Sequence, residues 1–223
     1  MSPLRLLLVR HGQTLSNVEG IMDTAPPGAP LDETGRAQAD RLAERLAGED
    51  VVAVYASTAI RTQQTASPVA ARHELAVIVR DGLREVDVGA LEGMRGDEAL
   101  AEYDAMVTQW AAGDLGVGLR GGGETAHDVL ARYLATIEHV TANHSSGLVV
   151  VVSHGGAIRV AAMHLAGGLL TAEMMIEGAL PNTGWVMFEA MSADAGTSTR
   201  WRCLEWTGLQ VDSITQGEAS DHR

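Results

Sequence analysis

The chain has 223 residues, of which 46% are apolar and 20% charged, a composition typical of one ordered globular domain. Its formal net charge of -13 argues against nucleic acid or an anionic membrane as a partner, because both attract basic surfaces. The one cysteine, Cys203, excludes an internal disulfide and a cysteine-based metal site. Neither a signal peptide nor a run of about 20 apolar residues is found, so we expect a cytoplasmic protein.

The first part of the chain predicts two buried strands, each followed by a helix. The segment from Leu4 to Val9 is apolar on both faces and indicates a central strand. A helix is expected from the N-cap Asp32 to Gly48. Residues 51–57 predict a second buried strand, and the helix after it is expected to kink or restart at Pro68.

The second part continues the alternation. The predicted elements are a short strand at 76–79, a helix at 96–112, a glycine-rich connection at 113–124, a helix at 124–144, a buried strand and helix in GLVVVVSHGGAIR, and strands at 184–189 and 201–206. This pattern predicts an α/β fold, a three-layer α/β/α sandwich with a mostly parallel central sheet. Residues 1–210 are expected to form a single domain with a helical lid insertion at about 94–123, and residues 211–223 a polar tail.

Three polar segments follow predicted strand ends, where parallel sheets bind ligands. They are Arg10-His11-Gly12, Ser57 to Arg61, and Ser153-His154-Gly155. Arginines offer forked donors for phosphate oxygens, and histidines can act as nucleophile, acid or cation. Glycines after each histidine allow backbone N–H groups to approach an anion. Two histidines that each end a buried strand before a glycine favour a catalytic site over a structural role.

Five stretches of the sequence occur together in one order: RHGQTLSN, STAIRTQQTA, LREVDVGALEG, GGGET and VVSHGGAIR. In this order they resemble the histidine phosphatase superfamily, also called phosphoglycerate-mutase-like, and within it the phosphatases. The resemblance covers about residues 4–190. It implies hydrolysis of a small phosphorylated metabolite through a phosphohistidine, with no metal and no other cofactor.

The resemblance also implies roles for seven residues. His11 is the expected nucleophile, Glu85 the acid and base, and the phosphate is bound by Arg10, Asn17, Arg61, His154 and Gly155. Elementary chemistry agrees, since a neutral imidazole is a good nucleophile and the two arginines favour the neutral form of His11. A protonated His154 would in turn bind a phosphate anion well.

The sequence departs from the family pattern at three places. Asp23 stands where many phosphatases of the group have glutamine, and its carboxylate would repel phosphate unless it points away or pairs with an arginine. Val86 stands where the mutases place an arginine directly after the glutamate. The region from 94 to 123 is short beside the cofactor-dependent mutases and has two arginines, Arg95 and Arg120.

Two alternatives to a hydrolase stay open. One is a mutase that returns the phosphoryl group to a sugar acid, and the other is a catalytically silent module that binds a phosphorylated ligand. The presence of both His11 and Glu85 counts against the silent module. The substrate and a homo-oligomeric state are not determined by the sequence.

Overall fold

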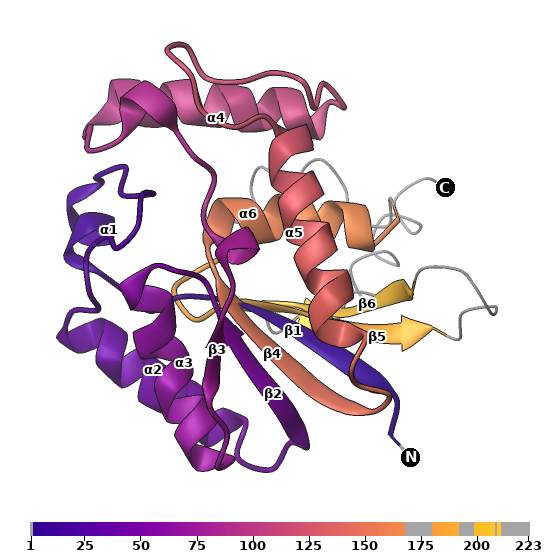
Figure 1. Cartoon of the computed structure of the whole chain (residues 1–223). Helices are drawn as coiled ribbons and strands as arrows, with labels where there is room; N and C mark the ends of the chain where they lie inside the picture. The colour runs from indigo at the N-terminus through magenta and orange to yellow at the C-terminus, as the bar shows by residue number, and fades with distance from the viewer. Residues whose placement is uncertain (1, 168–179, 192–198, 208, 211–223) are drawn as a thin grey trace, which may run out of the picture.

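The computed structural model describes residues 2–167, 180–191, 199–207 and 209–210 (Figure 1). The expected polar tail at 211–223 lies outside these residues. The described strands form one sheet of seven in the order β3-β2-β4-β1-β5-β6-β7. The strands are β1 (Leu4–Arg10), β2 (Val51–Ala56), β3 (Val77–Val79), β4 (Gly147–Ser153), β5 (Trp185–Met191), β6 (Arg200–Trp206) and β7 (Leu209–Gln210).

The sheet has a parallel half and an antiparallel edge. Strands β1 to β4 pair in parallel, whereas β5, β6 and β7 add antiparallel pairs beside β1. The predicted mostly parallel α/β fold is therefore confirmed. Strand β1 lies between β4 and β5, which explains why both of its faces are apolar: Leu6, Leu7, Leu8 and Val9 are all fully buried.

Helices cover both faces of the sheet (Figure 1). They are α1 (Leu15–Glu19), α2 (Glu33–Arg45), α3 (Ile60–Arg72), α4 (Asp97–Ala111), α5 (Ala126–Thr141) and α6 (Gly155–Leu165), with 3-10 turns η1 (Asp81–Leu83) and η2 (Gly89–Leu91). On one face Leu7 of β1 packs in a core with Leu42 of α2 and Val69 of α3. On the other face Leu8 packs in a core with residues of α5 and α6, such as Ile158. The three-layer sandwich is thus present.

The helix boundaries show where local signals succeed and fail. Asp32 caps α2 by accepting a hydrogen bond from the backbone nitrogen of Gly35 at 2.7 Å, as expected. The helix ends at Arg45, before Gly48. Helix α3 continues through Pro68, so the predicted restart is wrong. Burial of the following residue, Val69, against the sheet offsets the one backbone hydrogen bond that a proline removes.

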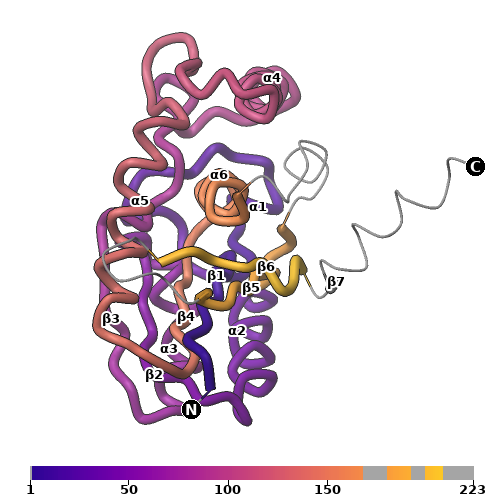
Figure 2. Tube along the Cα trace, turned by 90° about the vertical axis from the view of Figure 1, so that its right-hand side faces the viewer, coloured from indigo at the N-terminus to yellow at the C-terminus, as the bar shows by residue number. Residues whose placement is uncertain are grey.

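Helix α4 lies apart from the sheet, at the end of the molecule opposite the N-terminus (Figure 2). Its Met106, Val107 and Trp110 are buried and extend the core that lies under α5 and α6. The predicted helix at 96–112 is confirmed, and its function as a lid stays a prediction. Within the described residues, no helix is long and apolar enough to cross a membrane.

Candidate active site

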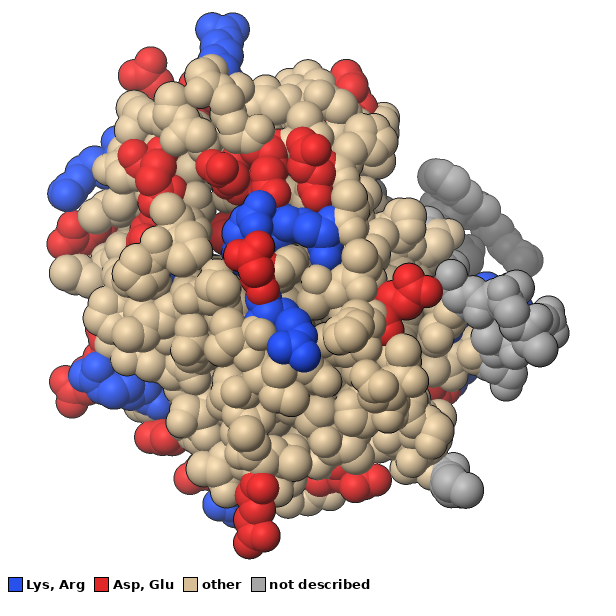
Figure 3. All heavy atoms as spheres, viewed as in Figure 1, with Lys and Arg blue, Asp and Glu red and all other residues tan. Residues whose placement is uncertain are grey.

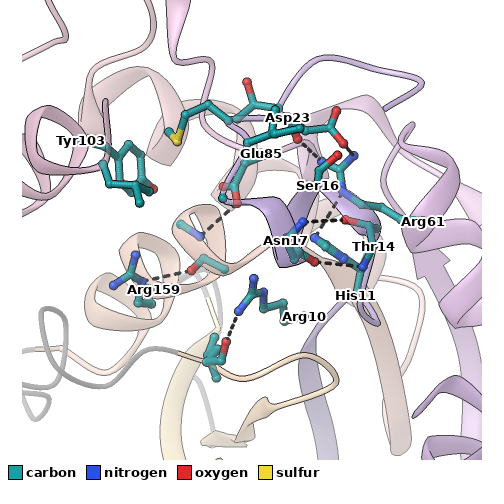
Figure 4. Close-up of a pocket in the computed structure, with 18 of the residues that line it drawn as sticks. Arg10, His11, Thr14, Ser16, Asn17, Asp23, Arg61, Glu85, Tyr103 and Arg159 are labelled. Atoms are coloured by element: carbon teal, nitrogen blue, oxygen red, sulfur yellow. Dashed lines mark hydrogen bonds and ion pairs between the residues drawn. The ribbon is translucent and has the colours of Figure 1, made fainter. Parts of the chain in front are cut away.

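The ends of β1 and β4 bring the two sequence patterns Arg-His-Gly and Ser-His-Gly side by side. Arg10 pairs with Ser153 in parallel register, so His11 and His154 leave the sheet as neighbours. Their ring centroids are 5.3 Å apart. This edge of the sheet borders a cavity of about 290 Å³. Residues that line it include Arg10, His11, Thr14, Ser16, Asn17, Asp23, Arg61, Glu85, Tyr103, Asp104, Gly155, Gly156, Arg159 and Leu180 (Figure 4).

The face that contains this cavity has a basic centre in an acidic surrounding. Figure 3 shows arginine side chains grouped in the middle of the face, bordered by carboxylates. Three arginines line the cavity: Arg10, Arg61 and Arg159. Three carboxylates, Asp23, Glu85 and Asp104, line it as well, so an anionic substrate on a chain with a net charge of -13 depends on direct contact with these arginines.

His11 has a defined tautomer. Its Nδ1 lies 2.7 Å from the carbonyl oxygen of Gly12, which can only accept, so Nδ1 bears the hydrogen. The other nitrogen, Nε2, accepts a hydrogen bond from Nε of Arg61 at 3.2 Å. Burial first, and then the charges of Arg61 and Arg10, lower the pKa of His11 well below its ordinary value. Nε2 therefore carries the unprotonated lone pair that a nucleophile needs, and in this structure that lone pair accepts from Arg61.

The glycine after His11 serves packing and not anion binding. A Cβ on Gly12 would lie 2.7 Å from the carbonyl oxygen of Gly35 in α2. The backbone N–H of Gly12 donates to Oγ1 of Thr65 at 2.9 Å. The expectation that this N–H faces a bound anion is therefore wrong, because a buried hydroxyl already accepts it. The absence of a side chain allows the strand end to pack against α2.

Arg61 joins the groups around the cavity. It lies in the first turn of α3, is 2% exposed, and donates from Nη2 to the carbonyl oxygen of Asp23 at 2.8 Å. The carboxylate of Asp23 lies 3.7 Å from Nη1 and also accepts from the backbone of Ala29 at 2.9 Å. Asp23 thus pairs with an arginine, which removes the repulsion that its position raised. Gly28 closes over the guanidinium, since its Cβ would lie 2.1 Å from Nη1.

Two guanidinium nitrogens beside the cavity are buried and have no hydrogen-bond partner among the described residues. They are Nε of Arg10 and Nη1 of Arg61. Buried donors without an acceptor are costly, and a bound oxyanion would supply an acceptor for Nε of Arg10, whereas Nη1 of Arg61 lies under Gly28 and beside the carboxylate of Asp23. Arg10 is oriented by a bond from Nη1 to the carbonyl oxygen of Leu180 at 2.5 Å. The geometry of Arg10 is therefore suited to phosphate.

His154 differs from its predicted state. It is fully buried, and it is absent from the residues that line the cavity, behind His11 and Arg61. Its Nδ1 lies 3.4 Å from Nη2 of Arg61, a donor, so the hydrogen is on Nε2, which lies 2.7 Å from Oγ of Ser57. Burial first, then Arg61 and His11, lower the pKa of His154 well below its ordinary value. The expected imidazolium is thus not favoured, because the buried ring lies beside the positive charge of Arg61, which disfavours a second positive charge.

Glu85 is held at the N-terminus of α6. Its carboxylate accepts hydrogen bonds from the backbone nitrogens of Gly156 at 3.2 Å and Ala157 at 2.8 Å. A Cβ on Gly156 would lie 2.8 Å from the Glu85 carboxylate and 2.3 Å from the hydroxyl of Tyr103. Glycine at this position therefore lets the carboxylate and Tyr103 approach the helix closely.

Asn17 is placed by a capping box at α1. Its side-chain oxygen accepts from the backbone nitrogen of Thr14 and from Nδ2 of Asn182, both at 3.2 Å. Asn182 also donates to the carbonyl oxygen of His11 at 3.1 Å. The segment from Leu180 to Asn182 thus supports both the nucleophile and Asn17. No motif in the sequence pointed to it.

The structure brings together the residues that the sequence selected and adds others. Six of the seven line the cavity: Arg10, His11, Asn17, Arg61, Glu85 and Gly155. The cavity also includes Tyr103 and Asp104 of α4 and Arg159 of α6, which the sequence indicated only as helix residues. Burial first, and then the charge of Glu85, raise the pKa of Tyr103, so its phenol stays protonated. Across the described ranges, no three His, Cys, Asp or Glu residues are grouped to hold a metal ion.

Comparison with known proteins points to one family. The model of the histidine phosphatase superfamily (branch 1) matches residues 6–204. Phosphoserine phosphatase 1 of Hydrogenobacter thermophilus is 32% identical over 155 residues, which are 68% of this chain and 71% of that protein. Phosphoglycerate mutase-like protein 4 of Arabidopsis thaliana is 32% identical over 160 residues, which are 69% of this chain and 67% of that protein.

Solved structures agree. A mycobacterial glucosyl-3-phosphoglycerate phosphatase in complex with VO3 is 30% identical, with a TM-score of 0.75 over 92% of this chain and 99% of that one. In this chain the Arg-His-Gly and Ser-His-Gly motifs lie side by side, as the rule for parallel strand ends predicts. The chain belongs to branch 1 of the histidine phosphatase superfamily.

Proposed function

We propose that the protein hydrolyses a phosphomonoester of a small metabolite through a phosphohistidine on His11, without a metal ion or other cofactor. The observation that supports this most is the unprotonated Nε2 of His11, a residue that lines the cavity and is hydrogen-bonded to Arg61. Arg10 and Arg61, which also line the cavity, add guanidinium donors for the phosphoryl oxygens. Nucleophile and charge stabilisation are thus within one cavity.

The reaction has two steps. In the first, Nε2 of His11 attacks phosphorus, a P–N bond forms and the bond from phosphorus to the leaving oxygen breaks. The carboxyl of Glu85 donates a proton to that oxygen. In the second, the carboxylate of Glu85 takes a proton from water, the water oxygen attacks phosphorus, and the P–N bond breaks. Inorganic phosphate leaves, and Nε2 regains its lone pair.

The named activities of two similar proteins support a phosphatase. One is a phosphoserine phosphatase and the other a glucosyl-3-phosphoglycerate phosphatase. Both names describe phosphate esters of small metabolites, so we infer the same class of substrate for this chain. The mixed lining of the outer cavity, with Leu100, Asp104 and Arg159, is compatible with a leaving group that has polar and apolar parts.

A mutase is the second candidate, and one relative is named as mutase-like. A mutase must bind a multiply anionic sugar acid and exclude water, which needs cations beyond those that bind the phosphate. Val86 is fully buried in the core and supplies none. Arg95 pairs with Glu19 at 3.5 Å, outside the cavity. Among the described residues that line the cavity, Arg159 is the one cation besides Arg10 and Arg61, and its Nε already donates to the carbonyl oxygen of Gly155 at 3.3 Å, so a hydrolase is favoured.

The test is to trap the intermediate. Wild-type protein given substrate labelled in the phosphoryl group should retain acid-labile, base-stable phosphate, and His11→Ala should retain none. A panel of phosphorylated metabolites assayed for phosphate release would identify the substrate. Turnover by His11→Ala close to that of the wild type would refute the covalent mechanism.

A further inference from the structure

The loop before Glu85 is fixed along its whole backbone by side chains. Arg132 of α5 donates to three of its carbonyl oxygens at 3.0, 2.7 and 2.8 Å, and Ser153 of β4 donates to the fourth at 2.7 Å. The four acceptors are, in chain order, Gly82, Leu83, Arg84 and Glu85. From the end of η1 to Glu85, every backbone carbonyl is thus bound by a side chain, and Arg132 supplies three of the four bonds.

Arg132 is itself held by Glu124. Nε and Nη2 of Arg132 donate to the two carboxylate oxygens, each at 2.7 Å, and both side chains are nearly buried, at 13% and 12% exposure. Glu124 also accepts from the backbone nitrogen of Asp87 at 3.0 Å. Burial acts to raise the pKa of Glu124, but the bonds from Arg132 and Asp87 lower it overall, so it stays a carboxylate. The GGGET stretch therefore has a structural partner in α5.

The loop also fits closely against α5. A Cβ on Gly82 would lie 2.0 Å from Oγ1 of Thr136 and 2.8 Å from the carbonyl oxygen of Arg132. The carboxylate of Glu85, at the other side, is bound by the N-terminus of α6. The carboxylate of Glu85 is thus held by the N-terminus of α6, and its backbone carbonyl is held by Arg132.

We propose that Arg132, held by Glu124, is a positioning residue for the proton transfer by Glu85. This inference rests on the function proposed above. A general acid must lie within hydrogen-bond reach of the leaving oxygen, and a displacement of about 1 Å can cost about 10²-fold in rate. Without the guanidinium the loop loses three of its four carbonyl bonds, so Glu85 no longer meets that oxygen reliably.

The leaving group distinguishes this role from a general effect on the fold. Nitrophenolate leaves without a proton, whereas ethoxide requires one. We therefore expect Arg132→Met to lower kcat/KM for ethyl phosphate roughly 10²-fold and that for 4-nitrophenyl phosphate less than about threefold. The ratio of the two values reports the first step only, because kcat/KM is insensitive to the later hydrolysis of the phosphohistidine.

Matched variants make the test specific. Arg84→Met removes a guanidinium that also contacts Glu124, at 3.1 Å, but whose side chain binds none of the loop carbonyls, so the ratio should stay at the wild-type value. Arg132→Lys should recover part of the loss. Arg132→Met leaves the nearly buried carboxylate of Glu124 without its main partner, and this unpaired charge could itself destabilise the protein. The double variant Arg132→Met/Glu124→Gln removes that charge and still lacks the bonds from Arg132 to the loop carbonyls. Glu85→Gln gives the full effect for comparison.

Several outcomes would overturn the proposal. Equal losses on both phosphate esters in the folded double variant, as judged by its melting temperature, would mean that Arg132 only stabilises the protein. An ethyl phosphate rate within about threefold of the wild type would mean that the loop holds Glu85 without it. Wild-type turnover of 4-nitrophenyl phosphate and its loss in His11→Ala establish the proposed function separately, so these results refute the positioning role alone.

Discussion

Acidification should destabilise the protein through His11 and His154, because the fold buries both rings in the neutral form. Burial and the nearby Arg61 lower both pKa values well below the ordinary 6.5. In the unfolded chain the same histidines take up protons near pH 6.5. Above that pH the two states bind equal numbers of protons. As the pH falls below 6.5, the unfolded state binds more, so the free energy of unfolding decreases until the folded-state pKa is reached.

The magnitude follows from the interval that is crossed. Over the interval in which a ring is neutral in the folded protein and protonated in the unfolded chain, each pH unit removes about 1.4 kcal/mol of stability. With both rings the slope is about 2.8 kcal/mol per pH unit, a large share of a typical stability of about 5–15 kcal/mol. The carboxylates with lowered pKa values, Asp32, Glu124 and Asp128, lose their contribution only below their ordinary values of 3.8 to 4.5. They therefore do not contribute in this interval.

Urea unfolding followed by tryptophan fluorescence at pH values between about 7.5 and 5 measures this loss. Two variants each keep the hydrogen bond that the ring donates but cannot titrate. His11→Asn retains a donor for the carbonyl oxygen of Gly12, and His154→Gln retains one for Ser57. Each should remove about half of the pH dependence of the wild type below pH 6.5, about 1.4 kcal/mol per pH unit, and the double variant should remove about twice that.

If the double variant loses stability as steeply as the wild type over this interval, the two rings are not the source. The neutral state that we assign to them would then be refuted, together with the tautomers. If one single variant removes as much of the pH dependence of stability as the double variant does, only that ring is neutral in the folded protein.

Three further predictions concern activity. Chelators should leave phosphate release unchanged, since Arg10 and Arg61 supply the positive charge, and vanadate should inhibit; a loss with chelator that a divalent ion restores would contradict the site. Phosphate release should outpace interconversion of 3- and 2-phosphoglycerate even with the bisphosphate primer, because Val86 adds no cation; isomerisation at about tenfold the rate of release would favour a mutase. Gly28→Ala should lower kcat/KM about 10²-fold by displacing Arg61, whereas Gly93→Ala, with a similar positive φ of 75° and nothing within 4 Å, should affect stability alone.

The sequence by itself determined the scaffold and the position of the chemistry. Alternating apolar strands and amphipathic helices are local patterns, and parallel strands place their carboxyl ends at one edge. That rule alone predicts that His11, Arg61 and His154 lie at the same edge of the sheet. The motif order added Glu85 and Asn17, which line the same cavity. Of the two outcomes expected at Pro68, a kink or a restart, the restart was wrong, because the packing that outweighs a proline is not local.

Only the tertiary structure decided the charge states and the supporting contacts. The neutral form of His154 depends on full burial and on Arg61, which is 93 residues away in the chain. Asp23 was ambiguous until the loop to Gly28 placed it against the same arginine. Arg132 has no motif, and its role follows from bonds to a loop 47 to 50 residues earlier. Burial and contacts between distant segments set pKa values and side-chain geometry, and neither is encoded in local periodicity.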